Sequence, residues 1–293
     1  MSVKGEETSI TLSAIIPVGG FPNGDALLKS WVLPQLPRGL EIIIVLDSDD
    51  ELVRQSVQQL LHSKPEDVRL EISQNRNPGS AREVGLRASK GKWVCFWDAD
   101  DLPEVSTIWR NVISSENQDA DIIAGRYRMI NFKTKNQIEY SWAKHDQVMN
   151  LYINPGLWRF VFKRKILEKV SFPPLKMGED QVFLFRSINA STHMNFVDDF
   201  FYNYYQYPSG QLTKLNGNFG DLIKSRDLCM EEYSLTRKRY ILLAIYRQDL
   251  TLIKRGRWLI KIKTIFHLVK LAGESRGNLK TLFKLIKLVR YEK

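Results

Sequence analysis

The sequence predicts an α/β fold in which an open, mostly parallel twisted sheet is flanked by helices and followed by a helical C-terminal appendage. Three observations lead to this prediction. Short apolar runs rich in β-branched residues alternate with segments of helical periodicity in the first part of the chain. These runs end in glycines or carboxylates, which is typical of strands that form a ligand crevice at the carboxyl edge of a sheet. From Phe219 onward the hydrophobic pattern is helical.

The first part of the chain accounts for the parallel sheet element by element. Its apolar runs predict buried parallel strands, and the segments between them have the amphipathic spacing of helices. Asp49 or Asp50 is available as the N-cap of the second helix. The expected strands span residues 10–18, 40–46, 68–73 and 92–97, and the expected helices span residues 25–31, 50–62 and 80–89.

The middle of the chain predicts further elements in a less regular order. We expect strands over residues 119–128 and 196–206. A strand that passes into a short helix is expected within residues 155–170. The spacing of residues 177–189 predicts a helix that begins near Glu179.

Charge divides the chain into two regions. Residues 214–293 hold 19 Lys and Arg against 7 Asp and Glu, whereas the preceding residues hold 24 against 26. The net charge of +10 therefore belongs to the end of the chain. We expect an α/β domain over residues 1–215, with halves 1–101 and 102–215, and a basic helical region over residues 216–293.

Composition restricts the class of protein. With 293 residues and 43% hydrophobic composition, the chain is large enough to bury a substantial core, which argues against intrinsic disorder. Cys95 and Cys229 are far apart and form no CxxC motif, so we expect neither a disulfide framework nor structural zinc. The N-terminus lacks a signal-peptide pattern, and no stretch approaches the roughly 20 apolar residues of a membrane span. We expect a cytoplasmic protein, either soluble or attached to the inner face of the membrane.

The apolar strand at residues 92–97 leads directly into Asp98, Asp100 and Asp101. Three carboxylates at one solvent-facing strand end repel one another unless a cation is bound. Mg²⁺ and Mn²⁺ prefer such oxygen ligands and share their coordination shell with substrate phosphates. We therefore expect Mn²⁺ or Mg²⁺ on Asp98 and Asp100. An acidic turn or helix cap is the alternative.

The segment before this cluster, NPGSAREVGLRASKGKWVCFWDADD, resembles glycosyltransferase family 2 of the GT-A type. In that family a loop Asn-x-Gly, a helix Ala-Arg-Asn-x-Gly and an apolar strand lead to Asp-x-Asp. The sequence departs from the pattern at Glu83, where the family has Asn, and at Leu46, where it often has Asp. The resemblance spans most of residues 10–213 and includes IIPVGG and EIIIVLDSDD at the first two strand ends. The residues in register are Asn77, Gly79, Ala81, Arg82, Gly85, Ala88 and Gly91.

The resemblance implies that a nucleotide-sugar donor binds to the first half of the domain and an acceptor to the second. Chemically, Arg82 offers a forked contact to a diphosphate, and Gly79 leaves room for the backbone to approach a ligand. An ion pair of Arg82 with Glu83, or solvation alone, is the alternative. The residues that the resemblance assigns to the donor are Pro17, Val18, Asp47, Asn77, Gly79, Arg82, Asp98 and Ala99.

The pair Glu179 and Asp180 resembles the Glu-Asp motif that supplies the general base in inverting members of the family. Transfer to a hydroxyl requires a carboxylate that removes its proton as the anomeric carbon is attacked from the face opposite the nucleotide. Asp180 is the first candidate for this base and Glu179 the second. An acidic first turn favoured by the helix dipole is the alternative.

The segment YPSGQLT resembles the end of the catalytic domain in many relatives. This makes Ser209 and Thr213 candidates for phosphate contacts, and an ordinary turn is an equal alternative. Trp142 and Trp158 are candidates for stacking on acceptor sugars, although aromatic side chains at such spacings more often fill a core.

The basic C-terminal region contains amphipathic helical patterns over residues 251–271 and 278–290. One interpretation is peripheral membrane contact through residues 251–293, with cations at lipid headgroups. The other is that the apolar faces pack on the α/β domain, and homo-oligomerisation also stays open. Nucleic-acid binding is not expected, since no recognisable motif is present. The apolar face of the second pattern consists of Leu279, Leu282, Phe283, Ile286 and Val289.

Together these features predict a metal-dependent inverting glycosyltransferase. The resemblance to bacterial capsule and lipopolysaccharide enzymes implies that the acceptor hydroxyl belongs to a glycan or lipid-linked glycan in polysaccharide biosynthesis. A membrane-peripheral scaffold that keeps the fold without catalysis is the alternative. A phosphotransferase with Asp98 as nucleophile is disfavoured, because such enzymes carry the motif on their first strand and have Thr or Val where Leu102 stands.

Overall fold

A computed structural model describes residues 10–21, 24–63, 67–116, 119–142, 155–207, 219–236, 239–256 and 258–274. The chain divides into two units. The first comprises Met1–Gln147 and Pro155–Leu215, and the second comprises Val148–Asn154 and Asn216–Lys293.

Four strands of the first unit form a parallel half-sheet in the order β3-β2-β1-β4. Every residue of β2 is buried, Glu41 included, as expected for a largely apolar strand covered on both faces. The bounds of these strands are β1 Leu12–Val18, β2 Leu40–Leu46, β3 Val68–Ile72 and β4 Trp93–Phe96.

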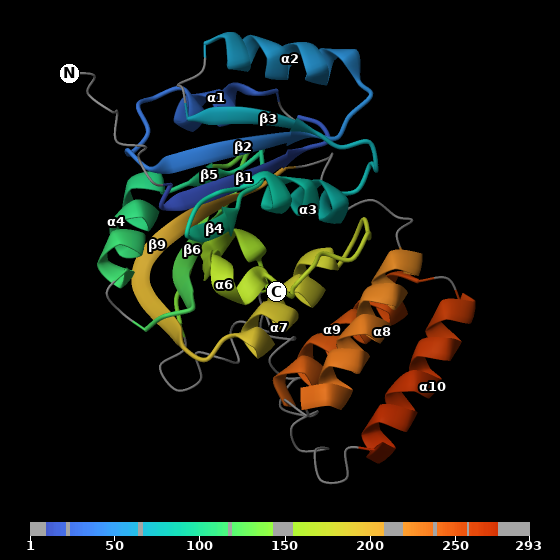
Figure 1. Ribbon diagram of the computed structural model, residues 1–293. Coiled ribbons are helices and arrows are strands. Elements are labelled where there is room, and N and C mark those ends of the chain that lie inside the picture. The colour runs from blue at the N-terminus through green and yellow to red at the C-terminus, as the bar shows by residue number, and fades with distance from the viewer. Residues whose placement is uncertain are drawn as a thin grey trace, which may run out of the picture. The chain divides into compact units, whose positions relative to one another are not determined.

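Three helices connect these strands: α1 (Ala26–Val32), α2 (Glu51–His62) and α3 (Pro78–Ala88). The helix α2 begins where Asp50 Oδ1 accepts the N–H of Leu52 at 2.9 Å, so Asp50 is the predicted N-cap. Figure 1 shows α3 lying along β1 and β2.

The second half of the domain extends the sheet with strands of mixed direction. The sheet continues from β4 in the order β8-β6-β9-β5, and β7 pairs with residues 127–130 of β6, on the same edge as β8. Among the strand pairs described in this half, β6–β9 alone is parallel. The predicted α/β class, with strands and helices alternating through a parallel half-sheet, is confirmed. The bounds are β5 Leu102–Pro103, β6 Ile122–Asn131, β7 Gln137–Tyr140, β8 Phe160–Lys163 and β9 Met194–Gln206.

The helices of this half include one that the sequence pattern did not predict. The helix α4 (Val105–Ser115) is rich in Ser, Thr and Asn, which are weak helix formers, yet it buries Ile108 and Val112 and packs on β9. The strand β5 has two residues and contains a proline, so no pattern marks it. The other helices within the described residues of this half are η1 Leu157–Arg159, α6 Arg164–Leu167 and α7 Glu179–Ala190.

The second unit contains α8 (Phe219–Thr236), α9 (Arg239–Arg255) and α10 (Trp258–Glu274), which lie side by side (Figure 1). Among the helices described, none is long and apolar enough to cross a membrane. The predicted apolar face within residues 278–290 lies outside the described residues.

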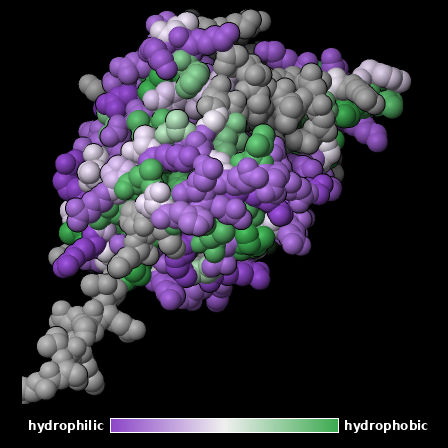
Figure 2. Space-filling view, turned by 90° about the horizontal axis from the view of Figure 1, so that it is seen from above, coloured by the Kyte–Doolittle hydropathy of each residue, from purple (hydrophilic) through white to green (hydrophobic). Residues whose placement is uncertain are grey.

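Figure 2 shows one face of the molecule coloured by hydropathy. Most of this face is hydrophilic, and hydrophobic side chains come to the surface in small separate patches. This is the ordinary surface of a folded protein, since apolar atoms always contribute part of it.

Candidate active site

Asp47 holds the loop between β3 and α3 at the carboxyl edge of the sheet. Its two carboxylate oxygens accept the backbone N–H groups of Arg76 and Asn77, at 3.0 and 2.8 Å. Its own N–H donates to the carbonyl of Val18 at 2.9 Å, which extends the pairing of β1 with β2. Asp47 is 7% exposed. A buried carboxylate that accepts two backbone N–H groups fixes the course of the loop.

This loop leads into α3 through Arg76 and Asn77. Asn77 is the N-cap of the helix, and its Oδ1 accepts the N–H of Ser80 at 2.7 Å. Arg76 has a positive φ of 51°, and its guanidinium is exposed and pairs with Asp49. No sequence pattern predicted a role for Arg76. It directly precedes Asn77 of the predicted Asn-x-Gly loop, so it adds an exposed positive charge at the carboxyl edge of the sheet.

Arg82 joins the two halves of the site. Its Nη1 donates to Oε1 of Glu179 at 2.6 Å, and its Nη2 donates to Oδ1 of Asp98 at 2.8 Å. Asp98 comes shortly after β4 and Glu179 begins α7, so one buried guanidinium connects the predicted metal loop with the predicted Glu-Asp motif. We refer to Arg82, Asp98 and Glu179 as the ionic triad.

The partners of Arg82 differ from both sequence-based expectations. Both terminal nitrogens are taken by carboxylates, so the predicted forked contact to a diphosphate is not available in this arrangement. Pairing with Glu83 is wrong too, because Glu83 pairs with Arg87 at 3.1 Å and accepts the N–H of Phe172 at 3.1 Å. The physical reason is burial. Arg82 is 7% exposed, and a buried cation requires hydrogen-bonded counter-charges.

Burial and mutual charge set the protonation of the ionic triad. Burial lowers the pKa of Arg82, but attraction to Asp98 and Glu179 outweighs this, and the pKa rises above the ordinary value of arginine. Burial, and next to it repulsion from Asp180, raises the pKa of Glu179, while Arg82 opposes this shift. The attraction to Arg82 therefore favours the charged form of Glu179.

Asp180 differs from Glu179 in accessibility. Glu179 is 6% exposed and committed to Arg82, whereas Asp180 is half-buried and accepts the N–H of Gln181 at 2.8 Å. Burial raises the pKa of Asp180 above that of an ordinary aspartate, and Arg82 opposes this. Gly178, with a φ of 82°, sets the entry into α7, a conformation that favours glycine. Of the two candidate bases, Asp180 is the more accessible.

The three carboxylates that follow β4 do not all reach the crevice. Asp98 and Asp100 are partly exposed, but Asp101 is 1% exposed. The chain turns here, with the N–H of Asp101 donating to the carbonyl of Asp98, and Asp101 Oδ1 accepts the N–H of Tyr205 at 2.7 Å. The expectation that all three carboxylates face solvent is therefore wrong for Asp101, which fastens the turn to β9.

Two tyrosines of the β9 segment hold the backbone of this turn. The N–H of Asp98 donates to the hydroxyl of Tyr202 at 2.8 Å, and the hydroxyl of Tyr207 donates to the carbonyl of Asp100 at 2.6 Å. From the sequence, the aromatic side chains of residues 200–207 are candidates for stacking on acceptor sugars, with core packing expected for most of them. The only signal of a further role was that a hydroxyl accompanies most of the rings.

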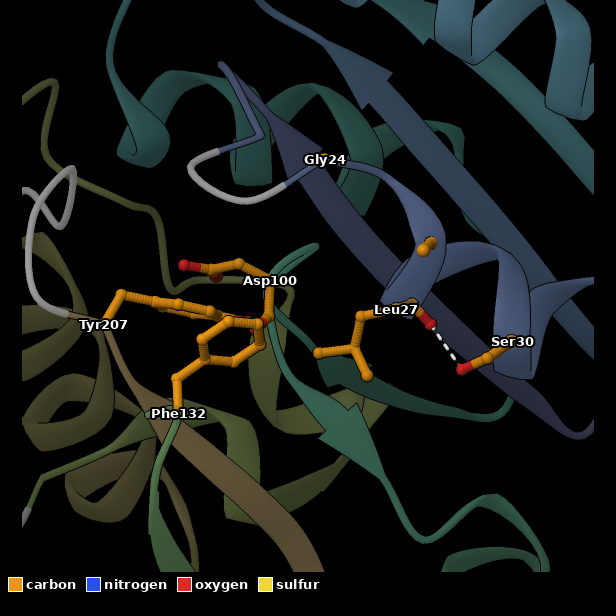
Figure 3. A pocket seen from close by; sticks show the side chains of 7 residues that line it. Gly24, Leu27, Ser30, Asp100, Phe132 and Tyr207 are labelled. Atoms are coloured by element: carbon orange, nitrogen blue, oxygen red, sulfur yellow. Dashed lines mark hydrogen bonds between the residues drawn. The ribbon is translucent and has the colours of Figure 1, made fainter. Parts of the chain in front are cut away.

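A pocket of about 270 Å³ opens beside Asp100. Figure 3 shows the rings of Phe132 and Tyr207 next to Asp100, with Leu27 and Ser30 of α1 on the other side. The two ring centroids are 4.7 Å apart. A carboxylate beside an aromatic wall is suited to a polar ring with apolar faces, such as a sugar. The lining residues are Gly24, Ala26, Leu27, Ser30, Asp100, Phe132 and Tyr207.

Among the described residues, no group of three or more His, Cys, Asp or Glu side chains is arranged to hold a metal ion. The turn after β4 instead offers two partly exposed carboxylates, Asp98 and Asp100. Burial, and next to it repulsion from Asp98, raises the pKa of Asp100 to about 6. Ser209 and Thr213 lie outside the described residues.

Two residues assigned to the donor by resemblance face the core instead. Val18 is fully buried and Ala99 is 6% exposed, and both belong to the hydrophobic core. Neither side chain is therefore open to a donor, and the assignment of these two residues to the donor stays a prediction. Alternation along β1 turns residue 18 inward and leaves its neighbour Pro17 half-buried.

Gly79 also has a different role from the one expected. A Cβ on Gly79 would lie 2.4 Å from the carbonyl oxygen of Pro173 and 3.2 Å from Cβ of Glu179. The missing side chain therefore lets α3 approach the segment that carries the Glu-Asp motif, instead of a ligand. Gly85 similarly brings α3 close to the sheet, where its Cβ would meet Ile15 at 2.4 Å.

Replacing Gly79 by Ala is expected to destabilise the protein by about 1–3 kcal/mol, because the backbone of Pro173 must move. The measurement is the midpoint of urea unfolding. Gly20→Ala is the matched control, since a Cβ there has nothing within 4 Å. Equal midpoints for the two variants would show that the Gly79 contact does not matter for stability.

A family model described as glycosyl transferase family 2 matches residues 26–186, which is more than half of the chain. The chain belongs to glycosyl transferase family 2. The matched region of this family 2 chain contains Asp47, the ionic triad, Asp100 and Asp180.

Curated relatives are similar over part of their length. A probable glycosyltransferase, YdaM of Bacillus subtilis, is 26% identical over 187 residues, which cover 58% of this chain and 44% of YdaM. The poly(ribitol-phosphate) beta-glucosyltransferase of Bacillus spizizenii is 28% identical over 205 residues, which cover 66% of this chain and 32% of that protein. The chain thus spans less than half the length of these two relatives.

Among solved structures, a fragment of S. aureus TarS in complex with UDP-GlcNAc superposes with a TM-score of 0.61 at 15% identity. The match covers 85% of this chain and 82% of the TarS chain. At this identity the similarity shows the shared GT-A-like fold.

Proposed function

We propose that this family 2 protein is a metal-dependent inverting glycosyltransferase that moves a sugar from a nucleotide sugar to a hydroxyl of a glycan or lipid-linked glycan. The observation that carries the proposal is the ionic triad. It ties the end of β4, with Asp98 and Asp100, to the start of α7, with Asp180. Such a transfer requires charge neutralisation at a leaving group and proton removal from an acceptor. Asp98 and Asp100 would hold the divalent cation for the first task, and Asp180 would serve the second.

The donor end of the site lies at the turn after β4. Asp98 and Asp100 suit a hard divalent ion that completes its shell with water and donor phosphates. Asp98 and Asp100 repel each other, and a bound cation would relieve this repulsion and favour both charged carboxylates. When bound, Mn²⁺ or Mg²⁺ supplies positive charge to the departing nucleoside diphosphate. The TarS fragment with UDP-GlcNAc supports a nucleotide sugar as donor.

The acceptor end lies at the start of α7. Asp180 is the proposed base that takes the proton of the acceptor hydroxyl at its carboxylate oxygen. Arg82 is a positioning residue, since it holds Asp98 and Glu179 at fixed distances without being open to the donor. The pocket between Asp100 and the rings of Phe132 and Tyr207 is the proposed binding site for a sugar ring.

The acceptor class follows from chemistry and from the relatives together. The Bacillus spizizenii relative acts on poly(ribitol-phosphate), as its name states, which supports a surface polysaccharide or its lipid-linked precursor. We propose that this reaction takes place on the cytoplasmic side, at the inner face of the membrane. The basic C-terminal region is the part of the chain proposed to bind lipid.

The test is release of nucleoside diphosphate from a panel of UDP-, GDP- and dTDP-sugars, with Mn²⁺, Mg²⁺ or EDTA, with and without glycan acceptors. One donor is expected to be turned over, with a loss of roughly 100-fold or more in EDTA. Asp100→Asn should reduce turnover by a similar factor. Asp198→Asn, which removes an exposed carboxylate of β9, should keep wild-type turnover. Absence of turnover with every donor would overturn the transferase proposal and favour the scaffold alternative.

A further inference from the structure

The helix α10 carries a continuous apolar face that is open to solvent. The spacing of its residues, at i, i+1, i+4, i+7 and i+8, places them on one side of the helix. Their exposed fractions range from 40% to 71%. We call this set the α10 apolar face, and it consists of Trp258, Leu259, Ile262, Ile265 and Phe266.

The orientation of this face is set by the opposite side of the helix. Thr264 is 1% exposed, and Nδ1 of His267 lies 2.8 Å from Oδ2 of Asp249 in α9. Asp249 is fully buried and also accepts Nη1 of Arg226 from α8 at 3.2 Å. These contacts fix the rotation of α10 about its own axis. The apolar face therefore points away from α8 and α9.

Lysines border the apolar face on both sides. At about 100° per residue, Lys261 and Lys263 fall on opposite edges of the stripe that Ile262 centres. Long lysine side chains beside an apolar stripe cover it with their methylene groups and direct their charges outward. This is the arrangement of a helix that lies in the plane of a membrane surface.

We infer that the α10 apolar face inserts into the interface of an anionic lipid bilayer, with Lys261 and Lys263 at the headgroups. This inference deepens the proposed function, which puts the basic C-terminal region at lipid, and lipid binding by this face can be measured without sugar transfer.

Three partners could cover the α10 apolar face: a lipid bilayer, a second copy of the chain, or the segment 275–293. Charge favours the bilayer. A second copy packed on the same face by twofold symmetry would bring Lys261 and Lys263 close to their own copies. The segment 275–293 carries six Lys and Arg against one Glu, so packing it here would also gather like charges. An anionic bilayer offers the opposite charge together with an apolar boundary for Trp258 and Phe266.

The test is co-sedimentation of the full chain with vesicles of phosphatidylcholine alone or with added phosphatidylglycerol. The wild type is expected to bind the anionic vesicles and to be released by salt. Ile262→Ser with Phe266→Ser should weaken binding by roughly tenfold or more, because two apolar side chains no longer insert. Lys261→Gln with Lys263→Gln should weaken it roughly thirtyfold. The matched control is Leu52→Ser with Ile138→Ser, which removes exposed apolar side chains from the first unit and should bind as the wild type does.

A fluorescent label distinguishes the occupants. Cys95 and Cys229 are buried, so Leu259→Cys gives a selective site for an environment-sensitive dye. A blue shift that requires anionic vesicles supports the inference. A blue shift already present without lipid, whether constant or rising with protein concentration, would show that the chain itself or a second copy covers the face and would overturn the inference. Wild-type binding by both paired variants would overturn it as well.

Turnover of the donor is measured without vesicles. This measurement tests the proposed function alone, whereas vesicle binding tests the membrane inference alone. Ile262→Ser with Phe266→Ser should keep wild-type turnover of a soluble donor, since neither residue belongs to the candidate active site.

Discussion

Replacing Asp180 by Asn is expected to lower kcat for sugar transfer by roughly 10²–10⁴-fold while donor affinity changes little. The amide keeps the size and shape of the side chain, so the half-buried position at the start of α7 is preserved. It cannot take the proton of the acceptor hydroxyl. The measurement compares transfer to an acceptor with binding of the donor alone, and Asp198→Asn serves as the exposed control.

The pH dependence of the wild type tests the same assignment. A base acts when deprotonated, so kcat/KM should fall as the pH falls through the pKa of Asp180. Because burial raises this pKa, the fall should lie above the ordinary aspartate value of about 3.9. Transfer by Asp180→Asn that stays within about threefold of the wild type would exclude Asp180 as the base.

Replacing Arg82 by Met is expected to destabilise the protein by roughly 3–5 kcal/mol and to abolish transfer. The substitution leaves Glu179, at 6% exposure, without its counter-charge in a desolvated site. Arg87→Met is the matched control on the same helix, because Arg87 is exposed and its pair with Glu83 should contribute less than about 1 kcal/mol. Urea unfolding measures both.

The double variant Arg82→Met with Glu179→Gln separates stability from positioning. Removing both charges of a buried pair should restore much of the lost free energy of unfolding. Transfer should stay low, because the start of α7 is no longer tied to Asp98. Equal unfolding midpoints for Arg82→Met and Arg87→Met would contradict a stabilising role for the ionic triad, and restored transfer in the double variant would contradict its positioning role.

Much of the fold could be predicted from local patterns. The strand β2 occupies residues 40–46 as expected, and Asp50 caps α2. A continuous apolar run or an N-cap before an amphipathic repeat is readable within about ten residues. Residues 102–118 were not predictable in this way, because β5 is only two residues long and α4 is built from weak helix formers held by burial against β9.

The candidate site could be predicted in part. The sequence pointed to Asp98, Asp100 and Asp180, because each lies at the end of a strand or the start of a helix within a recognisable pattern. It gave no way to see that Tyr202 and Tyr207 bind the backbone of the turn after β4, or that Asp101 is buried beneath it. Those contacts join residues about a hundred positions apart in the chain.

The sequence alone determined the alternation of strands and helices up to the fourth strand, the acidic ends of the second and fourth strands, and the basic character of the C-terminal region. Only the tertiary structure decided the partners of Arg82, the packing role of Gly79 and the outward orientation of the α10 apolar face. The physical reason is the difference between local and long-range interactions along the chain. Periodicity within one element shows which of its sides is apolar, whereas the partner of a buried charge and the side a helix presents are chosen by elements that meet only when the chain is folded.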